Sequence, residues 1–208
     1  MIGHGKPRHT FLLTAALCAG TMCAPYQPST TEAPITVANA RTVPVAPASD
    51  HITGTYPASC HRAPGDNPKL PVWACTPGSI RSDMVNSTDA QLAVTICHPG
   101  WTATVRPSVS ETEHVKTIAM IAYGVSPSER AITELDHKIP LELGGSNDVS
   151  NLWPEVSDEP GHGFRNTKDT VENDLRRAVC THRVSLVDAQ AAIATDWTTA
   201  ERALGMGA

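Results

Sequence analysis

Apolar and polar positions follow a regular pattern only from about Leu70 onward. Two short apolar runs closed by Pro-Gly turns predict strands, PVWACTPG at 71–78 and QLAVTICHPGW at 91–101. The segment SETEHVKTIAMIAYG at 110–124 predicts a helix, because its apolar residues recur three and four positions apart. Gly124 is a suitable residue to end that helix.

A hairpin followed by two helices is predicted in the second half of the chain. The run AITELDHKIPLEL at 131–143 predicts a strand, 144–151 a turn and 151–155 a short return strand. The segments 166–179 and 185–204 then show helical spacing of their apolar residues. Strands followed by helices in this order indicate an α+β fold.

The N-terminal region has the pattern of an export signal. Lys6 and Arg8 precede fourteen uncharged residues, a stretch too short for stable membrane insertion. We therefore expect a signal peptide at 1–24, a Pro/Ala/Thr-rich linker at 25–69 and a folded domain at 70–208. This organisation predicts a secreted, periplasmic or cell-envelope protein, with a lipoprotein as the less favoured alternative.

The chain has six cysteines, of which Cys60, Cys75, Cys97 and Cys180 remain after removal of the signal segment. In an oxidising compartment an even number predicts two disulfides, and the sequence leaves the three connectivities open. Buried free thiols in a cytosolic protein are the alternative. A cysteine zinc site is disfavoured, because no CxxC pair is present.

The charge of the chain is acidic and unevenly distributed. The formal net charge is −5, and residues 131–208 carry 7 Lys/Arg against 13 Asp/Glu. Such a field repels polyphosphates at long range. A nucleic-acid partner therefore requires a bound cation or a local basic patch.

The most informative stretch is DHKIPLELGGSNDVSNL at 136–152, with Asp136-His137, a Gly-Gly turn and Asn151 ahead of a polar helix. This pattern resembles the HNH endonuclease family, whose catalytic unit is a ββα-metal finger. The words CTPG, TICHPGWT, NLWPE, KDTVEN and DAQAAIATDW extend the similarity to small exported bacterial proteins with an HNH-like core, over about 73–197. The resemblance implies an α+β fold in which this finger is embedded in a small disulfide-stabilised domain with flanking helices.

The resemblance also implies roles for individual residues. His137 is expected to be the general base, Asn151 to brace the hairpin and Asp136 to bind a divalent metal ion. A second ligand is expected from the following helix, where Asp169 and Asn173 lie one turn apart. Further candidates for the site are His162, Asn166, Lys168 and Glu172.

The implied reaction is hydrolysis of phosphodiester bonds in DNA, with RNA as the less favoured substrate. The implied cofactor is Mg²⁺ or Mn²⁺, with Zn²⁺ as an alternative. Two other hypotheses remain open at this point. One is a non-catalytic secreted envelope or binding protein on a degenerate finger, and the other is a small zinc-binding interaction module.

Overall fold

A computed structural model describes residues 42–159, 161 and 163–207 of the chain. They belong to one unit that extends from Ile35 to Ala208. The predicted signal segment and the first part of the predicted linker lie outside the described residues. Within the described part, no helix is both long and apolar enough to span a membrane.

The predicted hairpin is formed by β3 (Thr133–His137) and β4 (Leu152–Val156), which pair antiparallel with His137 opposite Leu152. The first strand is shorter than predicted and ends at His137. Beyond it, Pro140 has no N–H to donate to a ladder. The chain there forms two short 3₁₀ segments, Leu141–Leu143 and Val149–Asn151.

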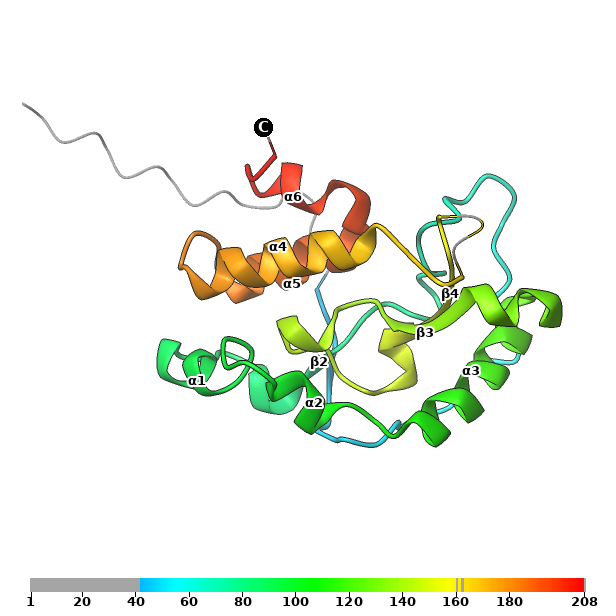
Figure 1. Cartoon of the computed structure of the whole chain (residues 1–208), viewed down its shortest axis with the longest axis horizontal. Helices are drawn as coiled ribbons and strands as arrows, with labels where there is room; N and C mark the ends of the chain where they lie inside the picture. Colours follow the sequence, from blue (N-terminus) through cyan, green and yellow to red (C-terminus); the bar gives the residue numbers. More distant parts are fainter. Residues whose placement is uncertain (1–41, 160, 162, 208) are drawn as a thin grey trace, which may run out of the picture. The chain divides into compact units, whose positions relative to one another are not determined.

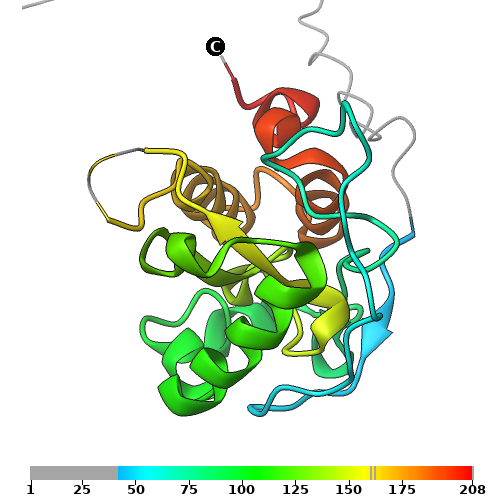
Figure 2. The same ribbon diagram turned by 90° about the vertical axis from the view of Figure 1, so that its right-hand side faces the viewer.

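Helices cover the hairpin on two sides (Figures 1 and 2). α3 (Val109–Tyr123) packs against both strands. On the other side lie α4 (Lys168–Cys180) and α5 (Leu186–Asp196), and the chain continues through the 3₁₀ turn Trp197–Thr199 into α6 (Ala200–Ala203). Helices together with small sheets confirm the α+β class.

Apolar side chains form a core on each side of the hairpin. Under α4 and α5, Leu175 and Ile193 pack with Ile139 and Leu143 of the hairpin loop. On the α3 side a smaller cluster contains Ala119, Leu135 and Leu152. Because Ile139 and Leu143 are fully buried beneath α4, the loop that follows His137 is held against that helix.

The prediction of a strand at 91–101 is wrong. The chain there forms two short helices, α1 (Asp89–Val94) and α2 (Trp101–Val105). Thr88 and Gln91 form a capping box at the start of α1, a local signal that outweighs the β-branched residues of the run. Two further 3₁₀ segments are Ser82–Met84 and Pro127–Ile132.

Residues 42–69, expected to be part of a flexible linker, pack against the domain. β1 (Val45–Ala46) pairs in parallel with β2 (Ile80–Arg81), and Thr53 donates its N–H to the Asn147 carbonyl at 3.1 Å. An extended segment of this kind is held by backbone hydrogen bonds, which composition does not reveal. The predicted strand at 71–78 forms no regular element, and its prolines lack the N–H groups that a strand needs.

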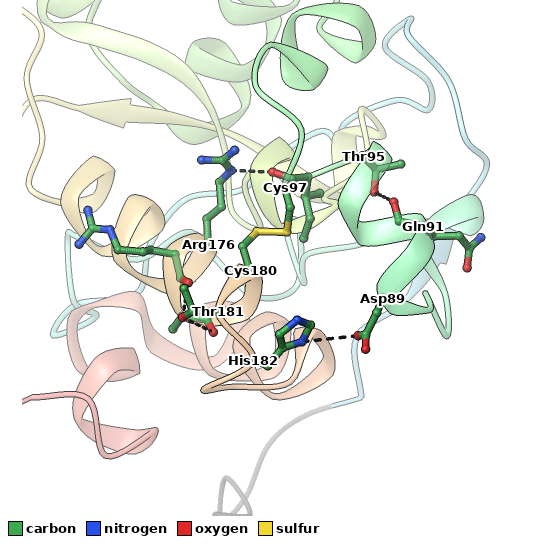
Figure 3. Close-up of a disulfide and its surroundings, with 11 residues drawn as sticks. Asp89, Gln91, Thr95, Cys97, Arg176, Cys180, Thr181 and His182 are labelled. Atoms are coloured by element: carbon green, nitrogen blue, oxygen red, sulfur yellow. Dashed lines mark hydrogen bonds and ion pairs between the residues drawn. A yellow bond between two sulfur atoms is a disulfide. The ribbon is translucent and has the colours of Figure 1, made fainter.

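Two disulfides join Cys60 to Cys75 and Cys97 to Cys180. The second links the turn after α1 to the last residue of α4, and Figure 3 shows Arg176 beside it. The Nε of Arg176 donates to the Ile96 carbonyl at 2.6 Å. These bonds confirm two disulfides and fix their connectivity, and they leave none of the four thiols for a zinc ion.

Candidate active site

The loop between β3 and β4 is organised around the buried side chain of Asn151. Its Oδ1 accepts hydrogen bonds from the backbone N–H of Ile139 at 3.0 Å and of Ser79 at 3.2 Å. Its Nδ2 donates to the carbonyls of Ile139 and Ser146, both at 2.9 Å. These are the side-chain to backbone hydrogen bonds expected of Asn151, and they fix the loop that follows His137.

The two glycines of the turn are required for different physical reasons. Gly144 has a φ of +75°, which favours glycine. Gly145 has no positive φ, but a Cβ atom there would lie 1.8 Å from the carbonyl oxygen of Ile139. The first glycine is therefore required by backbone conformation and the second by the close approach of Ile139.

A cavity of about 270 Å³ opens between the end of β3, the hairpin loop and α4. Its walls include Asp136 and His137 from β3, together with Asp169, Glu172 and Asn173 from α4. Adjacent strand residues normally point to opposite faces. Here the strand ends at His137, and both side chains reach the same cavity.

The ring of His137 is held in one tautomer by its neighbours. Its Nε2 lies 2.8 Å from Oδ1 of Asn147, while Nδ2 of Asn147 donates to the carbonyls of Ser49 and Val105, both at 2.8 Å. The two carbonyls orient the amide, so its oxygen faces His137 and must accept a proton from Nε2. His137 therefore carries its proton on Nε2, and Nδ1 is left with a free lone pair.

Nδ1 of His137 is accessible from the cavity. No described residue hydrogen-bonds to it, and every buried side-chain nitrogen or oxygen in the described part has a partner. Nδ1 must therefore reach the accessible surface, on a residue that lines the cavity. Burial lowers the pKa of His137 to about 4, against opposing effects of Asn147 and Asp136. The ring is neutral at pH 7 and can accept a proton at Nδ1.

Lys168 lies beside the cavity with only 1% of its surface exposed. Its ammonium donates to Oδ2 of Asp136 at 2.7 Å, to the carbonyl of His137 at 2.8 Å and to Oε1 of Glu172. Burial lowers the pKa of Lys168, but the nearby Asp136 and Glu172 more than reverse this, and the net shift is upward. Lys168 is thus charged, and all three of its N–H donors are used.

The cavity is lined by five carboxyl groups, those of Glu134, Asp136, Glu142, Asp169 and Glu172. Burial, together with the nearby Asp136, raises the pKa of Glu134 to about 7. Burial raises the pKa of Glu172 to about 8 even though Lys168 opposes the shift. Burial also raises the pKa of Glu142 and Asp169. The cavity consequently carries less negative charge at neutral pH than its composition indicates.

The divalent ion expected from the sequence does not fit this arrangement. Within residues 42–159, 161 and 163–207, no three or more His, Cys, Asp or Glu side chains are grouped so that they could hold one metal ion. The oxygen of Asp136 that faces α4 is bonded to the ammonium of Lys168 and to Nε1 of Trp153. With Lys168 in place, a positive charge is already bound where the ion was expected.

Some predicted site residues lie elsewhere. Asn166 is buried away from the cavity, where its Nδ2 donates to Glu155 and its Oδ1 accepts from the backbone N–H of Asp169. It therefore caps the first turn of α4 instead of facing the site. His162 lies outside the described residues.

Three residues near His137 were not predicted from the sequence. Asn147 orients the imidazole, Glu134 lines the cavity on β3, and Arg106 lines it from the end of α2. The guanidinium of Arg106 forms no hydrogen bond or ion pair with any residue that the structure describes. Glu134 was predictable as the residue two positions before Asp136 on the same strand face, whereas Arg106 and Asn147 reach the site only through the fold.

Comparisons of the chain with protein-family models, with curated proteins and with solved structures gave no match. The interpretation of the cavity accordingly depends on its own geometry and chemistry.

Proposed function

We propose that this cavity is the active site of an HNH-like hydrolase that cleaves phosphodiester bonds in nucleic acid, DNA in preference to RNA. The observation that carries the proposal is the single tautomer of His137, with Nε2 bonded to Asn147 and Nδ1 free at the cavity. A histidine that acts as the general base on water needs such an oriented, unprotonated nitrogen.

The chain order supports the same proposal. β3, β4 and α4 follow one another as strand, strand and helix, with Asp136 and His137 at the end of the first strand and Asn151 directly before the second. This is the order of the ββα finger that the HNH resemblance implies. Two disulfides also fit the secreted or periplasmic location that we propose, since such bonds persist mainly in oxidising compartments.

In the proposed mechanism, Nδ1 of His137 removes a proton from a water molecule as that water attacks the phosphorus atom. Arg106 binds a non-bridging oxygen of the phosphodiester and offsets its negative charge. Glu134, whose pKa is about 7, donates a proton to the departing sugar oxygen. The attacking water supplies the new phosphate oxygen, which keeps one of its protons, and the other proton passes to His137, while the proton of the alcohol comes from Glu134. The products are a phosphomonoester and an alcohol. His137 then releases its proton to solvent and Glu134 takes one up, which restores both groups.

The proposal is tested by incubating the full chain with plasmid DNA, single-stranded DNA and RNA, each in chelator and in Mg²⁺ or Mn²⁺. We expect cleavage in at least one of these conditions, and we expect His137→Gln to abolish it. His114→Gln is the matched control, because His114 is exposed on α3 outside the cavity. Absence of cleavage by the wild-type chain in every condition, or equal cleavage by His137→Gln, refutes the proposal.

A second candidate function is a non-catalytic secreted envelope or binding protein built on the same scaffold. It is favoured by Lys168, whose N–H donors are all used within the protein, so that Arg106 is the cation left for a phosphate among the described cavity-lining residues. This candidate predicts a stable fold that cleaves no nucleic acid and is unaffected by chelators.

A further inference from the structure

The environment of Lys168 resembles the ligand set of a hard metal ion more than that of an ordinary ion pair. Its ammonium is surrounded by two carboxylate oxygens, from Asp136 and Glu172, and one backbone carbonyl oxygen, from His137. Carboxylate and carbonyl oxygens are the ligands that Mg²⁺, Mn²⁺ and Ca²⁺ take in proteins. The oxygens come from the end of β3 and from α4, the two elements that the ββα resemblance assigns to metal binding.

Because Lys168 is buried, the groups around its ammonium must be specific partners. Burying an ammonium is unfavourable unless it is paired and fully hydrogen-bonded. A third carboxyl group, that of Glu155, also acts on Lys168, but burial and the nearby Asp136 raise its pKa to about 10. The carboxyl groups bonded directly to the ammonium are those of Asp136 and Glu172.

We propose that the ammonium of Lys168 is the resident cation of this site, occupying the position between Asp136 and Glu172 that a divalent ion would otherwise take. The wild-type chain then binds no divalent ion between these two carboxylates. Removal of the ammonium converts them into a divalent-cation site, because both residues also line the cavity, through which an ion is expected to reach the vacated position. The inference concerns ion binding and stands whether or not the cavity hydrolyses nucleic acid.

The test is a titration of Mn²⁺ alone into the full chain, followed by calorimetry and by electron paramagnetic resonance. We expect Lys168→Ala to bind one Mn²⁺ per chain with an affinity at least about tenfold above that of the wild-type chain. The additional substitution Asp136→Asn is expected to remove the gained site. Lys116→Ala is the matched control, since Lys116 is also buried but pairs with Glu113 on α3.

Two outcomes with a folded chain overturn the inference, and a third applies if the variant is unfolded. One is a wild-type chain that binds one Mn²⁺ as tightly as Lys168→Ala does and loses it with Asp136→Asn. The other is a folded Lys168→Ala chain that gains no Mn²⁺ site. Should Lys168→Ala be unfolded in chelator, Mn²⁺ is expected to restore its circular dichroism spectrum, and failure to do so also contradicts the inference. These readouts measure ion binding and folding, so their results do not depend on whether the chain cleaves nucleic acid.

Discussion

At the scale of single residues, the environment of His137 decides its chemistry. Asn147 fixes which ring nitrogen carries the proton, and burial keeps the ring neutral with a pKa near 4. A free imidazole, by contrast, is half charged near pH 6.5. The protein thus has a base that stays unprotonated over the whole physiological pH range. The same low pKa makes His137 a weaker base than a free imidazole.

This depressed pKa predicts a loss of stability in acid. Between about pH 6.5 and pH 4 the unfolded chain binds a proton at His137 that the folded chain does not bind, so the free energy of unfolding falls as pH falls through this window. The loss from this group is on the order of 3 kcal/mol. Urea unfolding at several pH values checks it by comparing the wild-type chain with His137→Gln, whose side chain does not titrate.

The difference in stability between the two proteins isolates His137, because their other titrating groups are shared. His114→Gln is the control and is expected to follow the wild-type curve, since His114 is exposed. A difference that stays constant from pH 7 to pH 4 would show that His137 is not held neutral by burial.

At the scale of elements, α4 is the part that connects the site to the rest of the fold. Its first turn carries Lys168, and its last residue, Cys180, is bonded to Cys97. The Cys97–Cys180 disulfide spans 83 residues, whereas Cys60–Cys75 spans 15. The longer closed loop restricts the unfolded chain more strongly.

We therefore expect the double variant Cys97→Ser/Cys180→Ser to lose more stability than Cys60→Ser/Cys75→Ser. Loop entropy alone gives about 4.5 kcal/mol for the first and about 3 kcal/mol for the second. Urea unfolding of both variants under non-reducing conditions measures the two losses. The reverse ranking would mean that local packing around Cys60 outweighs loop length.

At the scale of the whole molecule, the chain is acidic, and the cation at the cavity lies among negatively charged groups. The formal net charge is −5, and the cavity is lined by carboxyl groups with Arg106 as a nearby cation. Residues 42–69 contribute to this arrangement from far away in the sequence, because the carbonyl of Ser49 orients Asn147 and thereby His137.

A chain that begins at residue 60 is therefore expected to be less stable than one that begins at residue 42, by at least about 2 kcal/mol, because β1 and the Ser49 carbonyl are lost. The pKa of His137 should rise toward its ordinary value as its surroundings loosen. Thermal unfolding and an NMR titration of the His137 ring measure the two effects. Equal stability and an equal pKa of His137 in the two chains would show that residues 42–59 act only as a linker.

The sequence alone determined the elements whose signals are local. The spacing of apolar residues predicted α3, α4 and the last helices, and the turn residues predicted the hairpin, although its first strand ends at His137 and not at residue 143 as predicted. The role of Asn151 was predicted through the HNH resemblance, and the structure shows its side chain bonded to backbone groups of the loop. The prediction of a strand at α1 was wrong, because β-branched residues do not exclude a helix when a capping box stabilises its first turn.

The tertiary structure decided everything that depends on contacts between distant residues. The pairing of the cysteines, the packing of residues 42–69, the tautomer of His137 and the capture of Asp136 by Lys168 all join positions more than ten residues apart, directly or through Asn147 and Ser49. A lysine one turn before a glutamate on a helix has the same sequence pattern whether it lies in solvent or beside a second carboxylate. Only burial against the end of β3 turns Lys168 into a bound cation, and burial is a property of the folded chain.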